Sequence, residues 1–132
     1  MTTTETATSP THLMSLFARR AAAGDVDGLM ALYEPDAVFE PQLGTVLRGS
    51  DAIRAALTAF AALRPRIEYA GEADCVIVDD IAIVTNTWTV TGTLPDGALH
   101  REAGLSADVL RRQADGSWLI LIDQPRGTVV AG

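Results

Sequence analysis

The spacing of hydrophobic and polar positions changes once along the chain, near residue 64. Before this point apolar residues recur every three or four positions, which predicts helices over about 10–24, 25–35 and 50–63. Capping residues and prolines flank these segments and support their boundaries: Ser9, Pro10, Asp25, Pro35, Ser50 and Pro65. We therefore expect three helices in the first half of the chain.

From Arg66 onward the period becomes two, and the residues become β-branched and rich in threonine, as is typical of strands. Turns at Asp96-Gly97 and Asp115-Gly116 predict that the last three strands form an antiparallel meander. The expected strands cover residues 75–78, 81–93, 98–112 and 117–123, with shorter extended runs at 37–40 and 46–47. Strands this long must twist and coil, so the sheet is expected to have a concave face.

The order of the elements predicts the fold class. Helices that precede the strands, rather than alternating with them, indicate an α+β domain and not a parallel nucleotide-binding fold. The sequence also contains no glycine-rich phosphate-binding loop. We expect one domain over residues 11–126, with a disordered tail at 1–10 and a C-terminal tail at 127–132.

The composition restricts the classes of partner. A chain of 132 residues with a net charge of −7 and a pI near 4.6 disfavours nucleic acid, which requires clustered basic residues. No apolar stretch approaches the roughly 20 residues that cross a bilayer, so no membrane partner is expected. The single cysteine, Cys75, cannot form an internal disulfide and indicates a reducing, cytoplasmic setting. His12 and His100 follow no metal-binding spacing, and we expect neither a metal nor another cofactor.

Four local motifs are similar to those of a known superfamily: Ala23–Asp27, Ala31–Ala37, Arg48–Ile53 and Asp108–Arg112. They resemble nuclear transport factor 2, ketosteroid isomerase and the SnoaL-like polyketide cyclases, and the resemblance covers roughly residues 12–125. It implies three N-terminal helices packed on a strongly curved mixed, mostly antiparallel sheet that forms a cone-shaped pocket. The superfamily includes isomerases, cyclases, epoxide hydrolases and non-catalytic modules, so the fold alone does not identify a reaction.

Comparison with ketosteroid isomerase assigns three positions. Asp108 matches the neutral acid that stabilises the enolate oxygen in that enzyme. Phe17 occupies the position of the helix-one tyrosine and has the ring without the hydroxyl. Pro41 occupies the position of the catalytic base, with Glu40 one residue earlier. Two of the three groups are therefore absent, and the standard ketosteroid isomerase mechanism is not expected.

The resemblance also implies which side chains line the pocket. The expected ligand-binding residues are Phe17, Asn86, Trp88, Val90, Ser106 and Leu121. Asp108 and Asp123 are the candidate catalytic pair, and Glu40 is a weaker third candidate. Two carboxyl groups in an apolar pocket raise one another's pKa, which suits one of them to act as an acid and the other as a base. In the alternative interpretation, Asp108 is a structural buried acid and Asp123 bonds to backbone or to Arg126.

Two functional hypotheses remain open from the sequence. The first is a cofactor-independent isomerase, cyclase or epoxide hydrolase that acts on a small, apolar, polyketide- or terpenoid-like ligand. The second is a non-catalytic ligand-binding or dimerisation module. Under both we expect a homodimer that forms through the outer face of the sheet, because that face carries apolar residues. The residues predicted for it are Val84, Thr87, Thr89, Thr91, Val109, Ile120 and Ile122.

Overall fold

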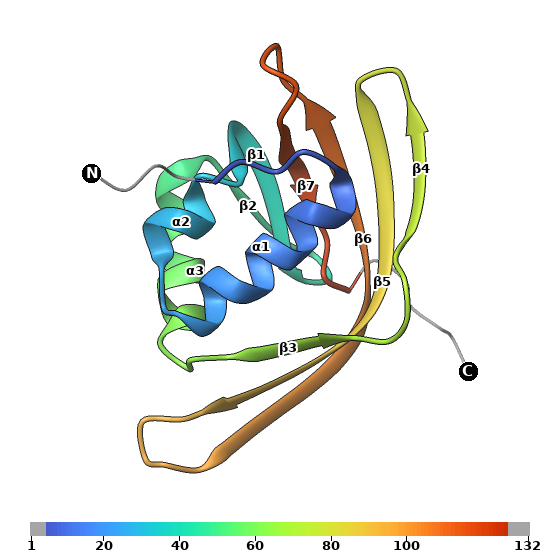
Figure 1. The fold of residues 1–132 in the computed structure, drawn as a ribbon. Helices are drawn as coiled ribbons and strands as arrows, with labels where there is room; N and C mark the ends of the chain where they lie inside the picture. The colour runs from blue at the N-terminus through green and yellow to red at the C-terminus, as the bar shows by residue number, and fades with distance from the viewer. Residues whose placement is uncertain (1–4, 127–132) are drawn as a thin grey trace.

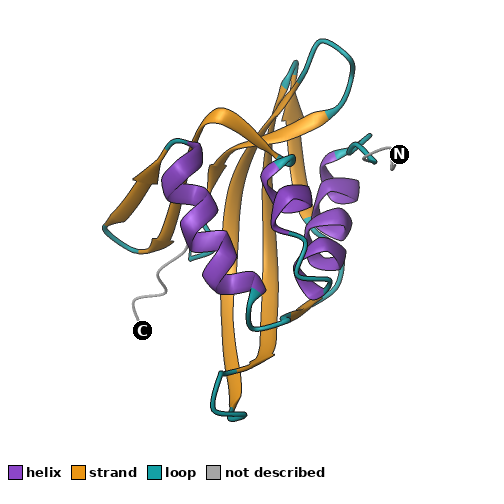
Figure 2. Ribbon diagram, turned by 90° about the vertical axis from the view of Figure 1, so that its left-hand side faces the viewer, coloured by secondary structure: helices purple, strands orange, loops and turns teal. Residues whose placement is uncertain are grey.

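Within residues 5–126, which the computed structural model describes, three helices pack on one side of a curved seven-stranded sheet (Figures 1 and 2). Positions 1–4 and the predicted C-terminal tail at 127–132 lie outside the described residues. The helices are α1 (Pro10–Ala22), α2 (Val26–Met30) and α3 (Ser50–Ala61). The strands are β1 (Tyr33–Gln42), β2 (Thr45–Arg48), β3 (Arg66–Tyr69), β4 (Asp74–Val78), β5 (Ile81–Thr93), β6 (Leu99–Arg112) and β7 (Trp118–Asp123).

The sheet has the strand order β2-β1-β7-β6-β5-β3, and β4 pairs with the other half of β5. Only the β1–β7 pair is parallel, so the sheet is mixed and mostly antiparallel, as predicted. The long β5–β6 hairpin curves beneath the helices, and its far end projects beyond them (Figure 1). This curvature leaves a concave face toward the helices, which confirms the predicted α+β cone.

Two of the three predicted helix caps are present. The Ser9 hydroxyl accepts a hydrogen bond from the His12 amide at 3.1 Å, and the Asp25 carboxylate accepts one from the Gly28 amide at 2.9 Å. The prediction that Ser50 caps α3 was wrong. Gly49 is the N-cap there, with a φ of 82° that favours glycine and with no side-chain cap, so Ser50 is the first helical residue.

The second helix is shorter than predicted. Helical spacing extended it to Pro35, but α2 ends at Met30 and strand β1 begins at Tyr33. The reason is tertiary: Tyr33 pairs with Ile120 of β7, and these sheet bonds are stronger than a local helical preference. Pro35 lies where the β1–β7 register is irregular, which is a position that tolerates proline within a sheet.

The N-terminal segment packs against the domain from Glu5 onward, which contradicts the predicted tail at 1–10 for its second half. Ala7 is buried, and its carbonyl oxygen accepts a hydrogen bond from the Trp118 amide at 3.0 Å. The Arg20 guanidinium donates to the backbone carbonyl of Glu5. These contacts attach the segment before α1 to both the helical layer and the sheet.

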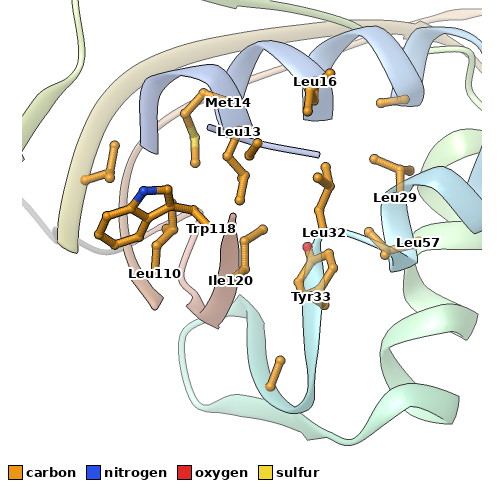
Figure 3. Packing of buried hydrophobic residues seen from close by; sticks show 14 of the residues in the cluster. Leu13, Met14, Leu16, Leu29, Leu32, Tyr33, Leu57, Leu110, Trp118 and Ile120 are labelled. Carbon is orange, nitrogen blue, oxygen red and sulfur yellow. The ribbon is translucent and has the colours of Figure 1, made fainter. Parts of the chain in front are cut away.

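The core lies between the helices and the concave face of the sheet (Figure 3). Leu13 of α1, Leu57 of α3, Leu110 of β6 and Ile120 of β7 are almost completely buried and belong to one cluster. Burying each such side chain contributes about 1.5–3 kcal/mol. The described residues include no helix of the length and apolarity that a membrane span requires.

Candidate functional site

A cavity of about 230 Å³ lies between the helices and the sheet. Its walls come from α1, α3, five of the strands and the segment after β7, and most of the lining residues are apolar. The lining residues are Met14, Phe17, Phe39, Pro41, Ala56, Leu57, Phe60, Ile67, Tyr69, Trp88, Val90, Glu102, Ser106, Asp108, Ile120, Asp123, Pro125 and Arg126. The two aspartates lie in this lining although they are almost fully buried, which makes them the first groups to consider as functional.

Asp108 is placed by the regular alternation of β6. It pairs with Val84 of β5, and both side chains point to the concave face. Only 5% of Asp108 is exposed, and its Oδ1 accepts a hydrogen bond from the Gln124 amide nitrogen at 2.9 Å. Burial raises the pKa of Asp108 well above its ordinary value, the charge of Asp123 raises it further, and the Gln124 amide opposes both effects.

Asp123 is placed by an irregularity in β7. Leu110 pairs with Ile120, whereas the preceding residue, Val109, pairs with Ile122, so Leu121 is an extra residue without a partner on β6. Such a bulge reverses the alternation of side chains. Ile120 and Asp123 therefore both point inward, while Ile122 between them points outward and is 37% exposed.

Three groups form one buried hydrogen-bonded chain at the inner end of the cavity. The Tyr33 hydroxyl donates to Oδ2 of Asp123, and the carboxyl groups of Asp123 and Asp108 are hydrogen-bonded to each other. Burial raises the pKa of Asp123, while the bonds from Tyr33 and Asp108 lower it. Burial and the neighbouring Asp123 charge raise the pKa of Tyr33 well above its ordinary value, so this hydroxyl stays protonated.

The two carboxyl groups favour a state in which they share one proton. Two adjacent buried carboxylates cannot both be ionised without a large electrostatic cost. Asp123 has two hydrogen-bond donors and holds the negative charge, whereas Asp108 keeps its proton. Tyr69 also lines the cavity, and burial raises its pKa, so its hydroxyl is a second neutral donor near the pair.

Trp88 forms the wall at the opposite end of the cavity. Its Nε1 donates to the Pro125 carbonyl oxygen at 2.8 Å, and the Arg126 guanidinium lies 5.7 Å from the centroid of the indole ring. Arg126 also forms an ion pair with Glu102 at 3.2 Å between its Nη2 and Oε1. Because this arginine pairs with Glu102, the alternative in which Arg126 binds Asp123 is not realised.

The structure brings most of the predicted site residues together. Asp108, Asp123, Phe17, Trp88, Val90 and Ser106 all line the cavity, as does Pro41. Asn86 is buried next to Ser106 on the paired strand, but it is not part of the cavity lining. Leu121 is the extra residue of the β7 bulge and does not reach the cavity, so its predicted orientation was wrong.

Glu40 lies outside the cavity lining as well. Its carboxylate accepts hydrogen bonds from the Gln124 side-chain amide at 2.9 Å and from the Gly44 amide at 3.2 Å. These bonds hold the β1–β2 turn and the segment after β7. The contacts of Glu40 are therefore those of a structural residue, and its catalytic role stays a prediction.

The sequence did not identify Tyr33 as part of the site. Its spacing from Val26, Leu29 and Met30 suggested a helical core residue, and no local signal indicated a bond to Asp123, ninety positions away. The motif Ala31–Ala37 was the one available clue. Among the described residues, no group of three or more His, Cys, Asp or Glu side chains has an arrangement that could hold a metal ion.

Two residues predicted for the outer face of the sheet point inward instead. Val84 is completely buried and Ile120 is 2% exposed, because both face the helices. Apolar residues on the outer face form a row across four paired strands: the exposed Val76 of β4, Ile83 of β5 and Ile122 of β7, and the half-buried Val109 of β6. The row contains Val109 and Ile122, as predicted.

Comparison with known proteins was consistent with this geometry. The model of the SnoaL-like domain family matches residues 15–120. A nuclear transport factor 2-like superfamily protein from Salmonella enterica has a TM-score of 0.81 at 15% identity, and the match covers 92% of this chain and 90% of that one. No protein of curated function matches the sequence significantly.

Two further solved structures have different functional descriptions. One, from Xanthomonas campestris, is provisionally described as a calcium/calmodulin dependent protein kinase II association domain. It has a TM-score of 0.78 at 22% identity, with 97% of both chains covered. The other, from Shewanella frigidimarina, is provisionally described as a ketosteroid isomerase, with a TM-score of 0.70 at 22% identity and coverage of 84% of this chain and 89% of that one. At these identities the likeness shows the fold alone.

Proposed function

Since the chain belongs to the SnoaL-like domain family, we propose that its cavity binds a small, mostly apolar ligand on which Asp108 and Asp123 move a proton. The observation that carries this proposal is the hydrogen-bonded carboxyl pair at one end of a mostly apolar cavity. A polyketide- or terpenoid-like compound, which combines an apolar carbon skeleton with few oxygens, suits such a lining.

The surroundings of the two carboxyl groups support different roles. Asp108 keeps its proton, so it can donate a hydrogen bond or the proton itself to a ligand oxygen. Asp123 is ionised and can accept a proton from a ligand carbon next to a carbonyl group. The proton that Asp123 removes can return to a second carbon of the same ligand. Such an isomerisation balances without a further reactant and leaves both carboxyl groups as they began.

The sequence resemblance to ketosteroid isomerase suggests this reaction class and also shows where the present site differs. Phe17 and Pro41 line the cavity at the positions where the resemblance placed that enzyme's tyrosine and base. Neither side chain can donate or accept a proton. The proposed base is therefore Asp123, which reaches the cavity from β7.

The proposal is tested by proton exchange. One- and two-ring ketones such as cyclohexanone and 1-tetralone would be incubated with the protein in D₂O, and loss of the α-proton signal followed by NMR. We expect exchange with the wild type, and a decrease of roughly 10²–10⁴-fold in the Asp108→Asn and Asp123→Asn variants. Asp36→Asn, which replaces an exposed carboxyl group on β1, is the matched control and should exchange at the wild-type rate.

Binding measured in parallel separates the two functional hypotheses. If the wild type binds these ketones but exchanges no proton on any of them, acid-base catalysis is refuted and the cavity serves as a non-catalytic ligand site. Equal exchange by wild type and by Asp123→Asn would remove Asp123 from the mechanism. Each variant would first be checked for cooperative unfolding.

We also propose that the protein forms a homodimer through the outer face of the sheet. The row formed by Val76, Ile83, Val109 and Ile122 supports this, since Val76 is 58% and Ile83 is 50% exposed. A continuous apolar row of this kind is costly to leave in water. Light scattering at micromolar concentration should give the mass of two chains, and a monomer mass would overturn the proposal.

A further inference from the structure

We infer that the cavity selects a compact ligand of one or two rings, with an oxygen directed toward Asp108, and that Trp88 sets this size limit. This inference rests on the proposed use of the cavity as a ligand site. It adds the class of ligand and identifies a residue that determines specificity.

The volume of the cavity limits the ligand. A dry cavity of about 150 Å³ lined by aliphatic and aromatic side chains binds one benzene molecule, which is about 25 Å³ for each carbon atom. At the same density, the cavity of about 230 Å³ holds about nine non-hydrogen atoms. A ring with short substituents fits this estimate and two fused rings lie close to it, whereas a four-ring steroid exceeds it about twofold.

The distance between the two ends of the cavity agrees with this ligand size. Trp88 pairs with Gly104 of β6, and Asp108 lies four residues further along the same strand. At about 3.3 Å per residue these backbone positions are about 13 Å apart. The side chains at both ends occupy part of that length, and the space left between them corresponds to one or two rings.

The distribution of polarity orients the ligand. The Asp108 carboxyl group and the Ser106 hydroxyl lie two residues apart on β6, toward the end of the cavity away from Trp88. At the Trp88 end the charged side chains of Arg126 and Glu102 are paired with each other. A ligand oxygen loses its bonds to water when it is buried, so it is favoured beside the Asp108 carboxyl group. The apolar part of the ligand then faces Trp88.

Trp88 cannot move aside to admit a longer ligand. Its indole nitrogen is bonded to the Pro125 carbonyl, and the Arg126 guanidinium covers the ring. The indole also lies against Gly104, where an added Cβ would be 2.6 Å from Cζ2 of Trp88. Contacts with Pro125, Arg126 and Gly104 therefore fix the ring in the one place that this glycine leaves open.

The test measures affinity against ligand size by calorimetry, with cyclohexanone, 1-tetralone and a three-ring ketone of the same series. We expect the wild type to bind 1-tetralone about tenfold more tightly than cyclohexanone, because more apolar surface is buried, and to bind the three-ring ketone weakly. Trp88→Phe should bind the three-ring ketone about tenfold more tightly than the wild type does. Gly104→Ala should push the indole into the cavity and weaken 1-tetralone binding.

Trp118→Phe is the matched control, since Trp118 is also buried beneath an arginine, Arg112, but lies outside the cavity lining. The order of affinities for the three ketones should be the same in Trp118→Phe as in the wild type. The inference is overturned if the wild type binds the three-ring ketone as tightly as 1-tetralone, if none of the ketones binds, or if both tryptophan variants change the size order equally. Because only binding is measured, the expected size order without proton exchange would support this inference and refute the proposed chemistry.

Discussion

Replacing Tyr33 by phenylalanine should lower the free energy of unfolding by an amount that depends on pH. The substitution keeps the ring in the core, where Figure 3 shows it beside Ile120, and removes only the hydroxyl that donates to Asp123. Asp123 would then carry its charge with one donor fewer. Because that hydroxyl lowers the pKa of Asp123, its loss should raise this pKa further.

The magnitude follows from the kind of bond that is lost. A buried hydrogen bond to a charged group contributes about 1.5–3 kcal/mol, and one between neutral groups about 1 kcal/mol. On the alkaline side of its titration Asp123 is ionised, and the variant should lose about 2 kcal/mol of unfolding free energy. On the acidic side Asp123 is protonated, and the loss should fall to about 1 kcal/mol.

The sign of the pH dependence follows from proton linkage. Burial raises the folded-state pKa of Asp108 and Asp123 above their unfolded values. At a pH between the unfolded-state pKa and the folded-state pKa, the folded state binds more protons than the unfolded state. The stabilisation is therefore fully present below the unfolded-state pKa and is lost as pH rises through the folded-state pKa. In Tyr33→Phe this fall should continue to higher pH than in the wild type.

Urea unfolding of both proteins from about pH 4 to pH 8 measures the effect, and side-chain carboxyl ¹³C NMR reports the titration directly. Tyr69→Phe is a suitable control, because the Tyr69 hydroxyl donates only a long bond, 3.4 Å, to the neutral Met14 carbonyl. Tyr69→Phe should therefore lose little unfolding free energy, and the loss should not depend on pH. A Tyr33→Phe loss that is the same on both sides of the titration would refute the assignment of the charge to Asp123.

Three further predictions concern the carboxyl pair, the dimer and the packing of β5. Asp108→Asn should unfold with less pH dependence than the wild type, because an amide can replace the protonated acid beside Asp123 without titrating; urea unfolding at two pH values checks this. Ile83→Asp should convert a dimer to a monomer in light scattering, since it places a charge in the exposed apolar row. Gly92→Ala should cost about 1–3 kcal/mol in thermal or urea unfolding, because its Cβ would lie 2.9 Å from Cβ of Leu63.

Local patterns predicted most of the secondary structure and failed where tertiary pairing took precedence. The strand at 81–93 was predicted with its observed bounds, because β-branched alternation and the adjacent turns agree there. Tyr33 illustrates the failure. The helical spacing is present in the sequence, but pairing with Ile120 places Tyr33 in a strand. The Tyr33 hydroxyl then reaches Asp123.

The amino-acid sequence by itself determined the α+β class and the family resemblance, because these depend on periodicity, element order and local motifs, and the resemblance implied that Asp108 points inward. Only the tertiary structure decided how Asp108 is partnered. The extra residue Leu121 turns Asp123 inward, and the start of β1 supplies the Tyr33 hydroxyl to it. A bulge and a long-range hydrogen bond leave no local periodic signal, so both become visible only when the strands are paired.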